Sequence, residues 1–491
     1  MHPVDYAVLA LFAAAVVAIG FAAVRKVGSS KDFFVGGGRV PWWLAGVSLH
    51  VSGYSAVVFV AWAGVAYRYG FTLYVWWALP TAVASIFTAY ILAPRWARLR
   101  ASLNVESPTE YLLARYGVSV QQTVALSGVI LKVFDVGAKW AALGILLEAF
   151  TGLPRAAGIV VSGIISLSYV TAGGLWADLY TNFVQFVVQV LGGTVLFVAV
   201  VRRLGGPASI FGLWSRLPPG HLRVFNGPFT PVLCAGYVFA AFLSSGGGTW
   251  NQAVRYLAAP SGQSARRSAI LCGALYAFWP LVLFFPMWAA PLLLPAKVDL
   301  AQIYPELVLH FLPTGLVGLL LAAVFATTMS MATSDTNTIS AVMTRDILPR
   351  LSPVFRDLPP RRELLVARLS TFAFIALTLV VAIEAERFGG VLGLTLSWFF
   401  ALVGPISIPM LGGLLPAFQG VDSAGAMASM LLGFAVFAAG KCLGADAGAM
   451  VAAPIFSSAL CFGAFAWLGR KHPSPHAEAL LRAIAVEAET R

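Results

Sequence analysis

Three charged residues stand close together in an otherwise apolar stretch. Lys132, Asp135 and Lys139 are spaced i, i+3 and i+7, so a helix would place all three on one face. Charges in an apolar span are costly, and they are found mainly where they line a solute or ion pathway or pair with one another. One hypothesis is a solute contact, whose net charge of +1 suits an anionic or zwitterionic ligand. The alternative is a self-neutralising bridge between a lysine and Asp135.

A second concentration of polar side chains lies between residues 327 and 340. It consists of Thr327, Thr328, Ser330, Thr333, Ser334, Asp335, Thr336, Asn337, Thr338 and Ser340. A helix this polar must face water, an ion or other helices rather than lipid. Hydroxyl and carbonyl oxygens suit hard cations, and Thr327, Ser330 and Thr333 would share one side of the helix. This stretch is therefore a candidate cation site.

Two other stretches combine small and hydroxylated residues that weaken a helix. Residues 48–55 read SLHVSGYS, and residues 244–250 read SSGGGTW. Interrupted helices in two halves of a membrane chain are typical of a transporter's solute and ion site, whereas close helix packing is the alternative. Ser52, Gly247 and Trp250 are thus candidate solute contacts. His50 is either a proton relay or a packing residue.

The composition indicates that these polar stretches lie within a membrane protein. Of 491 residues, 59% are apolar and 11% charged, against roughly 45–50% and 25% in soluble domains. The mean hydropathy is +0.84. Ten-residue alternation is absent, so the expected fold is an all-helical polytopic membrane protein and not a β-barrel. Apolar runs predict thirteen spans, near residues 4–24, 40–66, 71–97, 122–150, 157–172, 176–201, 229–250, 266–295, 313–345, 366–386, 391–416, 424–441 and 449–469.

The basic residues predict the orientation of the chain. The 32 Lys+Arg exceed the 20 Asp+Glu, which in a soluble chain would suggest a nucleic-acid or acidic partner. If the amino terminus lies outside, 21 of the 32 Lys and Arg residues fall in inner loops or the tail, and nine fall in outer loops. We therefore expect an inner or plasma membrane protein with its carboxyl terminus in the cytoplasm. The tail after residue 470 has the apolar spacing of a short helix.

The sequence shows no motif of an enzyme. No nucleophile–base constellation, phosphate loop or metal motif is present, and the four cysteines are scattered singly. We therefore predict no enzymatic activity, no cofactor and no nucleic-acid partner.

Five further motifs are spread along the chain. They are KDFFVGGGR at 31–39 before PWW at 41–43; SPTEYL at 107–112 before ARYG at 114–117; GGL at 173–175 with Thr181 and Gln185; NQ at 251–252 with RYLAA at 255–259; and TRDI at 344–347. These motifs resemble those of the sodium/solute symporters, a family that includes proline, sugar, sialic acid and pantothenate carriers. Together they lie in the family's order and topological places, and the resemblance extends to about residue 420.

The resemblance implies a leucine-transporter-like core of inverted five-helix repeats, here spans 2–6 and 7–11. Four regions are expected on this basis. They are a first span and loop at 1–30, the transporter core at 31–420, two accessory spans at 421–470 and a cytoplasmic tail at 471–491.

The resemblance also implies a sodium site. The family's ligands correspond to the carbonyls of Val51, Tyr54 and Thr327 and to two hydroxyl positions, here Ser330 and Met331. A thioether is a poor ligand for a hard cation. Asn182 stands where many members have an aspartate that supports sodium coupling. These two departures predict weak sodium dependence or none, with Thr333 and Ser334 as further candidate oxygens.

We therefore expect a secondary transporter that moves a small organic solute by alternating access near the bilayer midplane. Tyr54, Trp62 and Trp140 are candidate pocket or gate aromatics, although packing explains each equally well. The coupling ion is sodium or, alternatively, a proton carried by Asp335, His50 or the charged triad. Uncoupled transport, or a sensor with a separate partner protein, is the remaining alternative. The sequence specifies neither the solute nor the oligomeric state, and membrane lipid is the other expected contact.

Overall fold

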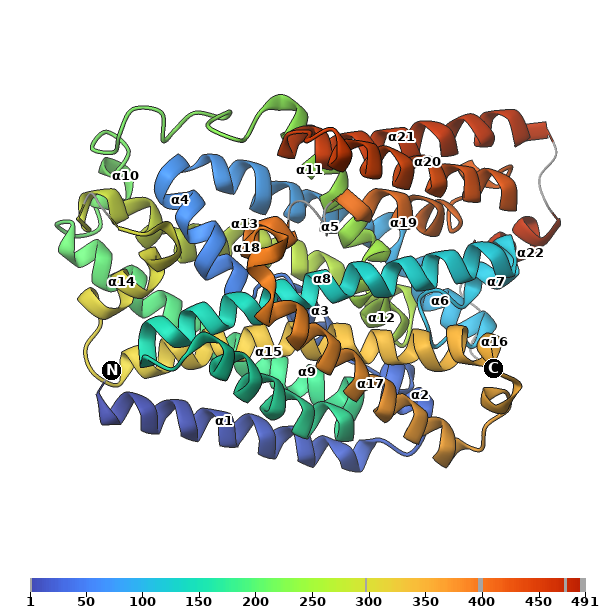
Figure 1. Ribbon diagram of the computed structural model, residues 1–491, viewed down its shortest axis with the longest axis horizontal. Coiled ribbons are helices and arrows are strands. Elements are labelled where there is room, and N and C mark those ends of the chain that lie inside the picture. The colour runs from blue at the N-terminus through green and yellow to red at the C-terminus, as the bar shows by residue number, and fades with distance from the viewer. Residues whose placement is uncertain (1, 296–297, 396–400, 472–474, 486–491) are drawn as a thin grey trace.

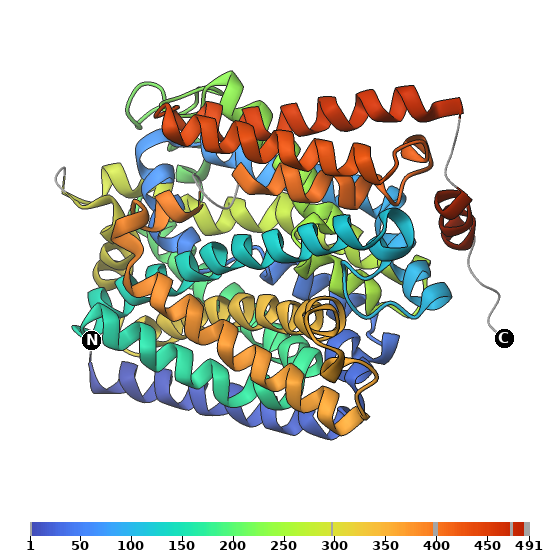
Figure 2. The same ribbon diagram turned by 45° about the vertical axis from the view of Figure 1, so that its right-hand side comes forward.

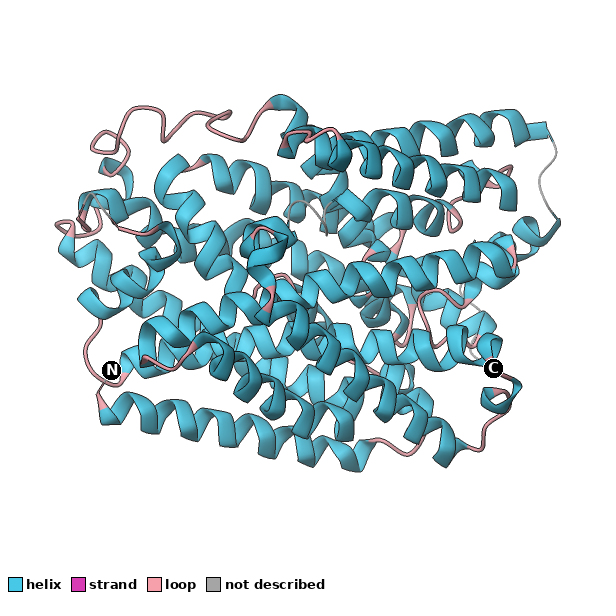
Figure 3. Cartoon of the chain, in the orientation of Figure 1, coloured by secondary structure: helices cyan, strands magenta, loops and turns pink. Residues whose placement is uncertain are grey.

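The computed structural model describes residues 2–295, 298–395, 401–471 and 475–485. Within these ranges the chain forms helices and connecting loops and no strand (Figure 3). The predicted all-helical class is therefore confirmed. The main helices are α1 (Pro3–Ala23), α3 (Trp42–Val51), α5 (Leu79–Ile91), α8 (Val118–Thr151), α9 (Arg155–Arg203), α11 (Pro231–Leu243), α13 (Gly262–Ala289), α15 (Leu316–Val342), α17 (Pro360–Ile383), α19 (Ala401–Gly412), α20 (Ser423–Cys442) and α21 (Ala447–Leu468).

Nine helices of the described ranges are long and apolar enough to cross a membrane. They match nine of the thirteen predicted spans. The other four predictions, near 40–66, 122–150, 157–172 and 391–416, correspond to helices that are interrupted, charged or short. These four segments do not form a long, continuous apolar helix, so the count of thirteen spans stays a prediction.

The helices are arranged around a polar centre. In Figures 1 and 2, α8 and α15 run through the middle of the molecule, with α1 on one flank and α20 and α21 on the opposite flank. In the most apolar stretch of α15, 89% of the residues are buried, against 17% in α1. The hydroxyl-rich helix therefore faces other helices, and α1 presents its apolar surface outward.

Two predicted spans, 157–172 and 176–201, correspond to the two helical segments of α9, which meet at a sharp kink. The junction is Gly174, whose φ of 52° and ψ of −140° depart from helical values. A Cβ at this position would lie 2.6 Å from the carbonyl oxygen of Phe33. Glycine is therefore required both by the backbone conformation and by the close approach of the neighbouring segment.

The two predicted helix interruptions are confirmed. The first follows α3, which ends at Val51 and resumes as helix after Ser55. The second follows α11, where Gly247 and Trp250 have φ values of 100° and 74° before α12 (Asn251–Leu257) begins. Both breaks expose backbone groups inside the molecule, which is tolerated only where protein or a polar cavity surrounds them.

The predicted helix of the tail is α22 (Pro475–Ala485). It lies against α6 (Ala93–Leu103), where Arg98 and Ser102 donate hydrogen bonds to its last carbonyls. Figure 1 places the start of α1 and α22 at opposite ends of the longest axis.

Candidate functional site

A polar cavity of about 150 Å³ lies between the two helix breaks. The first break contributes Ser52 and Gly53, and α8 contributes Lys132 and Asp135. The remaining walls come from the second break, α5, α11, α12, α13, α15 and the helical turn before α5. These residues are Trp77, Thr81, Tyr237, Ala240, Ala241, Ser244, Ser245, Thr249, Asn251, Gln252, Tyr276 and Met331. The two interrupted helices thus share one cavity that is rich in hydroxyl, amide and aromatic groups.

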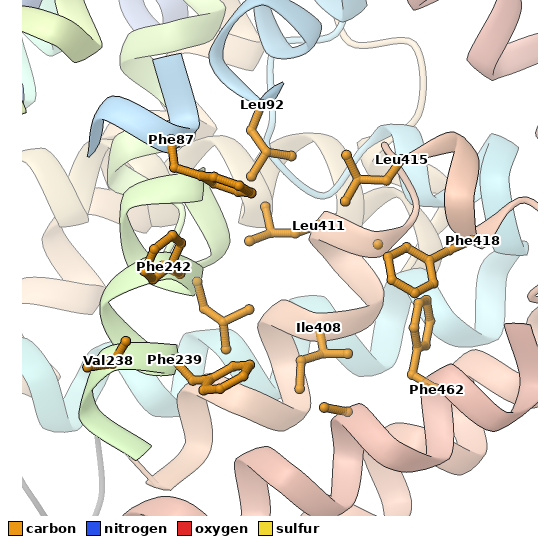
Figure 4. A pocket seen from close by; sticks show the side chains of 13 residues that line it. Phe87, Leu92, Val238, Phe239, Phe242, Ile408, Leu411, Leu415, Phe418 and Phe462 are labelled. Carbon is orange, nitrogen blue, oxygen red and sulfur yellow. The ribbon is translucent and has the colours of Figure 1, made fainter. Parts of the chain in front are cut away.

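A larger hollow of about 410 Å³ lies elsewhere, between α5, α11, α19 and α21 (Figure 4). Its walls are apolar side chains such as Phe87, Phe239, Leu411 and Phe462. These walls offer no group that could orient a polar solute, so this hollow suits an acyl chain and is not the candidate site.

Four charged side chains form a closed cluster beside the polar cavity. The Nζ of Lys132 lies 2.9 Å from Asp135 Oδ2 and 2.7 Å from Asp335 Oδ1. The Nζ of Lys139 lies 2.9 Å from Asp135 Oδ2 and 2.6 Å from Asp335 Oδ2. The prediction of one shared helix face is confirmed. The predicted net charge of +1 is wrong, because Asp335 of α15 makes the cluster neutral.

The members of this cluster differ in their access to the cavity. Asp335 is fully buried, and the side chain of Asp135 is 13% exposed. Lys132 and Asp135 line the cavity, whereas Lys139 and Asp335 lie behind them. The cluster therefore joins α8 to α15 and presents one cation and one anion to a solute.

The candidate sodium ligands lie at the first break and on the facing turns of α15. The backbone N–H of Ala56 donates to Thr328 Oγ1 at 2.7 Å, which ties this break to α15. The carbonyl of Val51 accepts from the N–H of Tyr54 at 2.9 Å. Ser330 Oγ is buried and has no hydrogen-bond partner among the described residues. Met331 borders the solute cavity.

Asn182 lies in α9 next to the first broken helix. Its Nδ2 donates to Ser48 Oγ at 2.6 Å, and its Oδ1 has no partner among the residues described. The side-chain oxygens of Asn182 and Ser330 are therefore both buried and both without a hydrogen-bond partner among the described residues. Both are hard oxygens that a cation would stabilise.

Thr333 and Ser334 make different contacts from those expected of sodium ligands. Thr333 Oγ1 lies 3.2 Å from Asp178 Oδ1, and Ser334 Oγ donates to Asp178 Oδ2 at 2.6 Å. Arg255 Nη2 lies 3.1 Å from the same carboxylate oxygen. Asp178 is not among the predicted site residues, and the basic count predicts an inner-loop position for Arg255. The structure corrects that placement, because Arg255 is 1% exposed.

The predicted aromatic candidates Tyr54, Trp62 and Trp140 are not among the residues that line the cavity. Trp62 packs edge-on against Tyr237 at 6.1 Å between ring centroids, and Trp140 is buried. The ring of Trp250 packs against α8 at Gly128. A Cβ atom added to Gly128 would lie only 2.0 Å from the Trp250 ring. Gly247 packs against Ala253. These contacts support the packing alternative.

The aromatic walls that sequence reasoning missed are Trp77, Tyr237 and Tyr276. No local pattern distinguishes them from other aromatic residues in apolar spans. His50 and Tyr54 form a layer behind Tyr276, with ring centroids 4.9 Å and 5.6 Å from it. The contacts of His50 favour packing over proton relay.

Two of the five sequence motifs meet at one end of α15. Asp346 accepts hydrogen bonds from Ser107 and Thr109, both at 2.5 Å, and from Gln121 Nε2 at 2.9 Å. Nearby, burial raises the pKa of the Glu106 carboxyl above its ordinary value. These motifs therefore hold the end of α15 against the loop before α7 (Tyr111–Tyr116).

The chain matches known proteins over most of its length. Residues 33–433 match the model of the sodium:solute symporter family. The sodium/sialic acid symporter SiaT of Proteus mirabilis is 28% identical over 431 residues, which cover 83% of each chain. The human sodium/iodide cotransporter is 30% identical over 83% of this chain and 64% of its own.

Solved structures share the fold. A Na+-coupled sialic acid symporter in a substrate-bound, outward-open state superimposes with a TM-score of 0.82 at 24% identity, covering 95% of this chain and 98% of the other. The nucleobase-cation-symport-1 transporter Mhp1 superimposes with a TM-score of 0.59 at 13% identity, covering 91% and 97%.

Proposed function

The chain belongs to the sodium:solute symporter family and is a secondary active symporter, not an enzyme; from this membership we propose that it carries a small polar organic solute without net charge. Relatives are named for sialic acid, iodide and monocarboxylates as well as for glucose and myo-inositol. The observation that supports a neutral or zwitterionic solute here is the neutral four-charge cluster at the cavity. In this cluster an anionic solute would meet no lysine that is not already paired with carboxylates.

The proposed cavity orients the solute by three kinds of contact. Trp77, Tyr237 and Tyr276 offer flat apolar faces, and the hydroxyls and amides of the second break offer hydrogen bonds. Lys132 and Asp135 offer one charge of each sign. Because both helix breaks line the cavity, movement of either broken helix would open or close access to the solute, as alternating access requires.

The proposed coupling ion is a single, weakly held sodium ion. Its ligands are the carbonyls of Val51, Tyr54 and Thr327 and the hydroxyl of Ser330. The unpartnered oxygens of Ser330 and Asn182 support this assignment. Met331 supplies no hard oxygen and Asn182 supplies no charge, so the affinity for sodium is lower than that of a site with a full oxygen set.

Proton coupling is the second candidate, and it is less well supported. Asp335 would be the proton carrier, yet it lies between two lysine ammonium groups and is fully buried. Its ion pairs with both lysines are typical of a structural bridge between helices.

The proposed organisation keeps the inverted-repeat core at residues 31–420, with accessory spans at 421–470 and a tail at 471–491. The amino terminus lies outside a plasma or inner membrane, and the carboxyl terminus lies in the cytoplasm. Single cysteines placed in the 345–368 loop and the 202–223 loop test this orientation, in a background in which the exposed Cys442 is replaced by serine. An impermeant reagent on intact cells should label only the 202–223 loop, and labelling of only the 345–368 loop would reverse the assignment.

Uptake into proteoliposomes tests the function. A radiolabelled panel of sugars, polyols, amino acids, monocarboxylates and inorganic anions would be offered with sodium and proton gradients imposed separately. We expect accumulation of a neutral or zwitterionic member under the sodium gradient. Accumulation of an anion alone, or under the proton gradient alone, would contradict the proposal.

A further inference from the structure

The guanidinium group of Arg255 is enclosed by oxygen atoms from three other elements. Nη2 lies 3.1 Å from Asp178 Oδ2 on α9 and 2.5 Å from Ser334 Oγ on α15. Nε donates to Ser48 Oγ on α3 at 2.7 Å. Nη1 donates to the carbonyl of Asn251 at 2.7 Å on its own helix. Each nitrogen of the guanidinium is therefore hydrogen-bonded.

The acceptors around Arg255 form the kind of oxygen set that a hard metal cation uses. One carboxylate and the hydroxyls of Thr333 and Ser334 lie together, and all of these side chains are buried. A buried carboxylate is strongly unfavourable unless a positive charge lies beside it. In this chain Arg255 supplies that positive charge.

One turn earlier on α15 the arrangement differs. Ser330 Oγ and Asn182 Oδ1 have no hydrogen-bond partner within the described part of the chain. Ser48 links the two places, because its Oγ accepts from both Asn182 Nδ2 and Arg255 Nε. Ser330 Oγ on α15 and Asn182 Oδ1 on α9 are thus buried oxygens without a cation of the chain, whereas the oxygens of Asp178, Thr333 and Ser334 lie beside Arg255.

We infer that Arg255 is a built-in cation that occupies the Asp178–Thr333–Ser334 oxygen set in place of a metal ion. The chain then binds at most one sodium ion, at the Ser330 end of the same helix. A guanidinium fixed on α12 neutralises Asp178 but cannot be released to either side of the membrane. It therefore contributes charge to the site without contributing to the ion gradient that drives transport. The sodium ion at Ser330 rests on the proposed function, whereas the role of Arg255 does not.

Equilibrium binding of radioactive sodium to the purified full-length protein tests the inference. The unmodified protein should bind no more than one ion. Arg255→Gln should bind one ion more than the unmodified protein, because the Asp178 oxygens then lack a fixed cation. Arg255→Lys, which keeps the charge, and Arg255→Gln combined with Asp178→Asn, which removes the carboxylate, should not gain an ion. Monodisperse elution in size-exclusion chromatography controls for folding.

Two results would overturn the inference: two sodium ions bound to the unmodified protein, or no gain in folded Arg255→Gln. If Arg255→Gln does not fold, the count for the unmodified protein still decides, since a second ion refutes the role of Arg255. If the unmodified protein binds no sodium while Arg255→Gln binds one, the proposed sodium coupling fails and the inference about Arg255 stands.

Discussion

Two neighbouring turns within the polar run on α15, named here the Ser330 end and the Thr333–Asp335 end, have different partners. At one end, Thr333, Ser334 and Asp335 are engaged by Asp178, Lys132 and Lys139. At the other end, Ser330 Oγ has no partner in the described residues, and Met331 borders the solute cavity.

This contrast separates residues that hold the helices together from residues that could bind an ion. The Thr333–Asp335 end is a network of paired charges that joins α8, α9, α12 and α15, and its groups are already satisfied. At the Ser330 end one buried hydroxyl has no partner among the described residues, and the neighbouring Met331 lines the cavity. The first end is therefore expected to govern stability, and the second is expected to govern ion affinity.

The largest effect should come from breaking the network at Asp335. Asp335→Asn leaves two buried lysines with one aspartate, and loss of one partner of a buried ion pair costs about 3–5 kcal/mol. We expect a large fall in the melting temperature of the detergent-solubilised protein. Asp135→Asn is the matched control. Its side chain is 13% exposed rather than fully buried, so it should cost less. Equal melting temperatures for the two variants would contradict the distinction.

A smaller effect should separate the two lysines. Lys132 lines the cavity and Lys139 does not, although both contact Asp135 and Asp335. Lys132→Met and Lys139→Met should destabilise the protein similarly. Only Lys132→Met should also raise the KM for the solute, by about tenfold if one charged hydrogen bond of about 1.4 kcal/mol is lost. Equal KM values in the two variants would leave the cluster a purely structural bridge.

Much of the fold follows from local sequence properties, and the site follows only in part. Hydropathy located the long apolar helices, and small hydroxylated residues located both helix breaks. The pairing of Asp335 with Lys132 and Lys139 depends on the tertiary contact of α15 with α8, which residue spacing does not report. The burial of Arg255 could not be predicted for the same reason. A basic residue near the end of an apolar run is usually assigned to a loop, and only the tertiary contact with Asp178 shows that it is buried.

The smallest expected effect concerns the oxygen atoms at the Ser330 end. Met331→Ser combined with Asn182→Asp adds one hydroxyl and one carboxylate next to the expected sodium ligands. Half-maximal uptake should then require several-fold less sodium, since each hard oxygen replaces part of the ion's hydration shell. Met331→Leu, which adds no oxygen, is the control. An unchanged sodium requirement in the double variant would show that carbonyl oxygens alone set the affinity.

The central claim is symport of one solute with one sodium ion, and the accumulation ratio at zero membrane potential tests it most directly. Proteoliposomes clamped with potassium and valinomycin would be given a series of sodium gradients. With one ion per solute, the steady-state solute ratio should rise about tenfold for each tenfold increase in the sodium gradient. A rise of about a hundredfold would show two coupled ions, and no rise would show that sodium does not drive transport; either result would contradict the account.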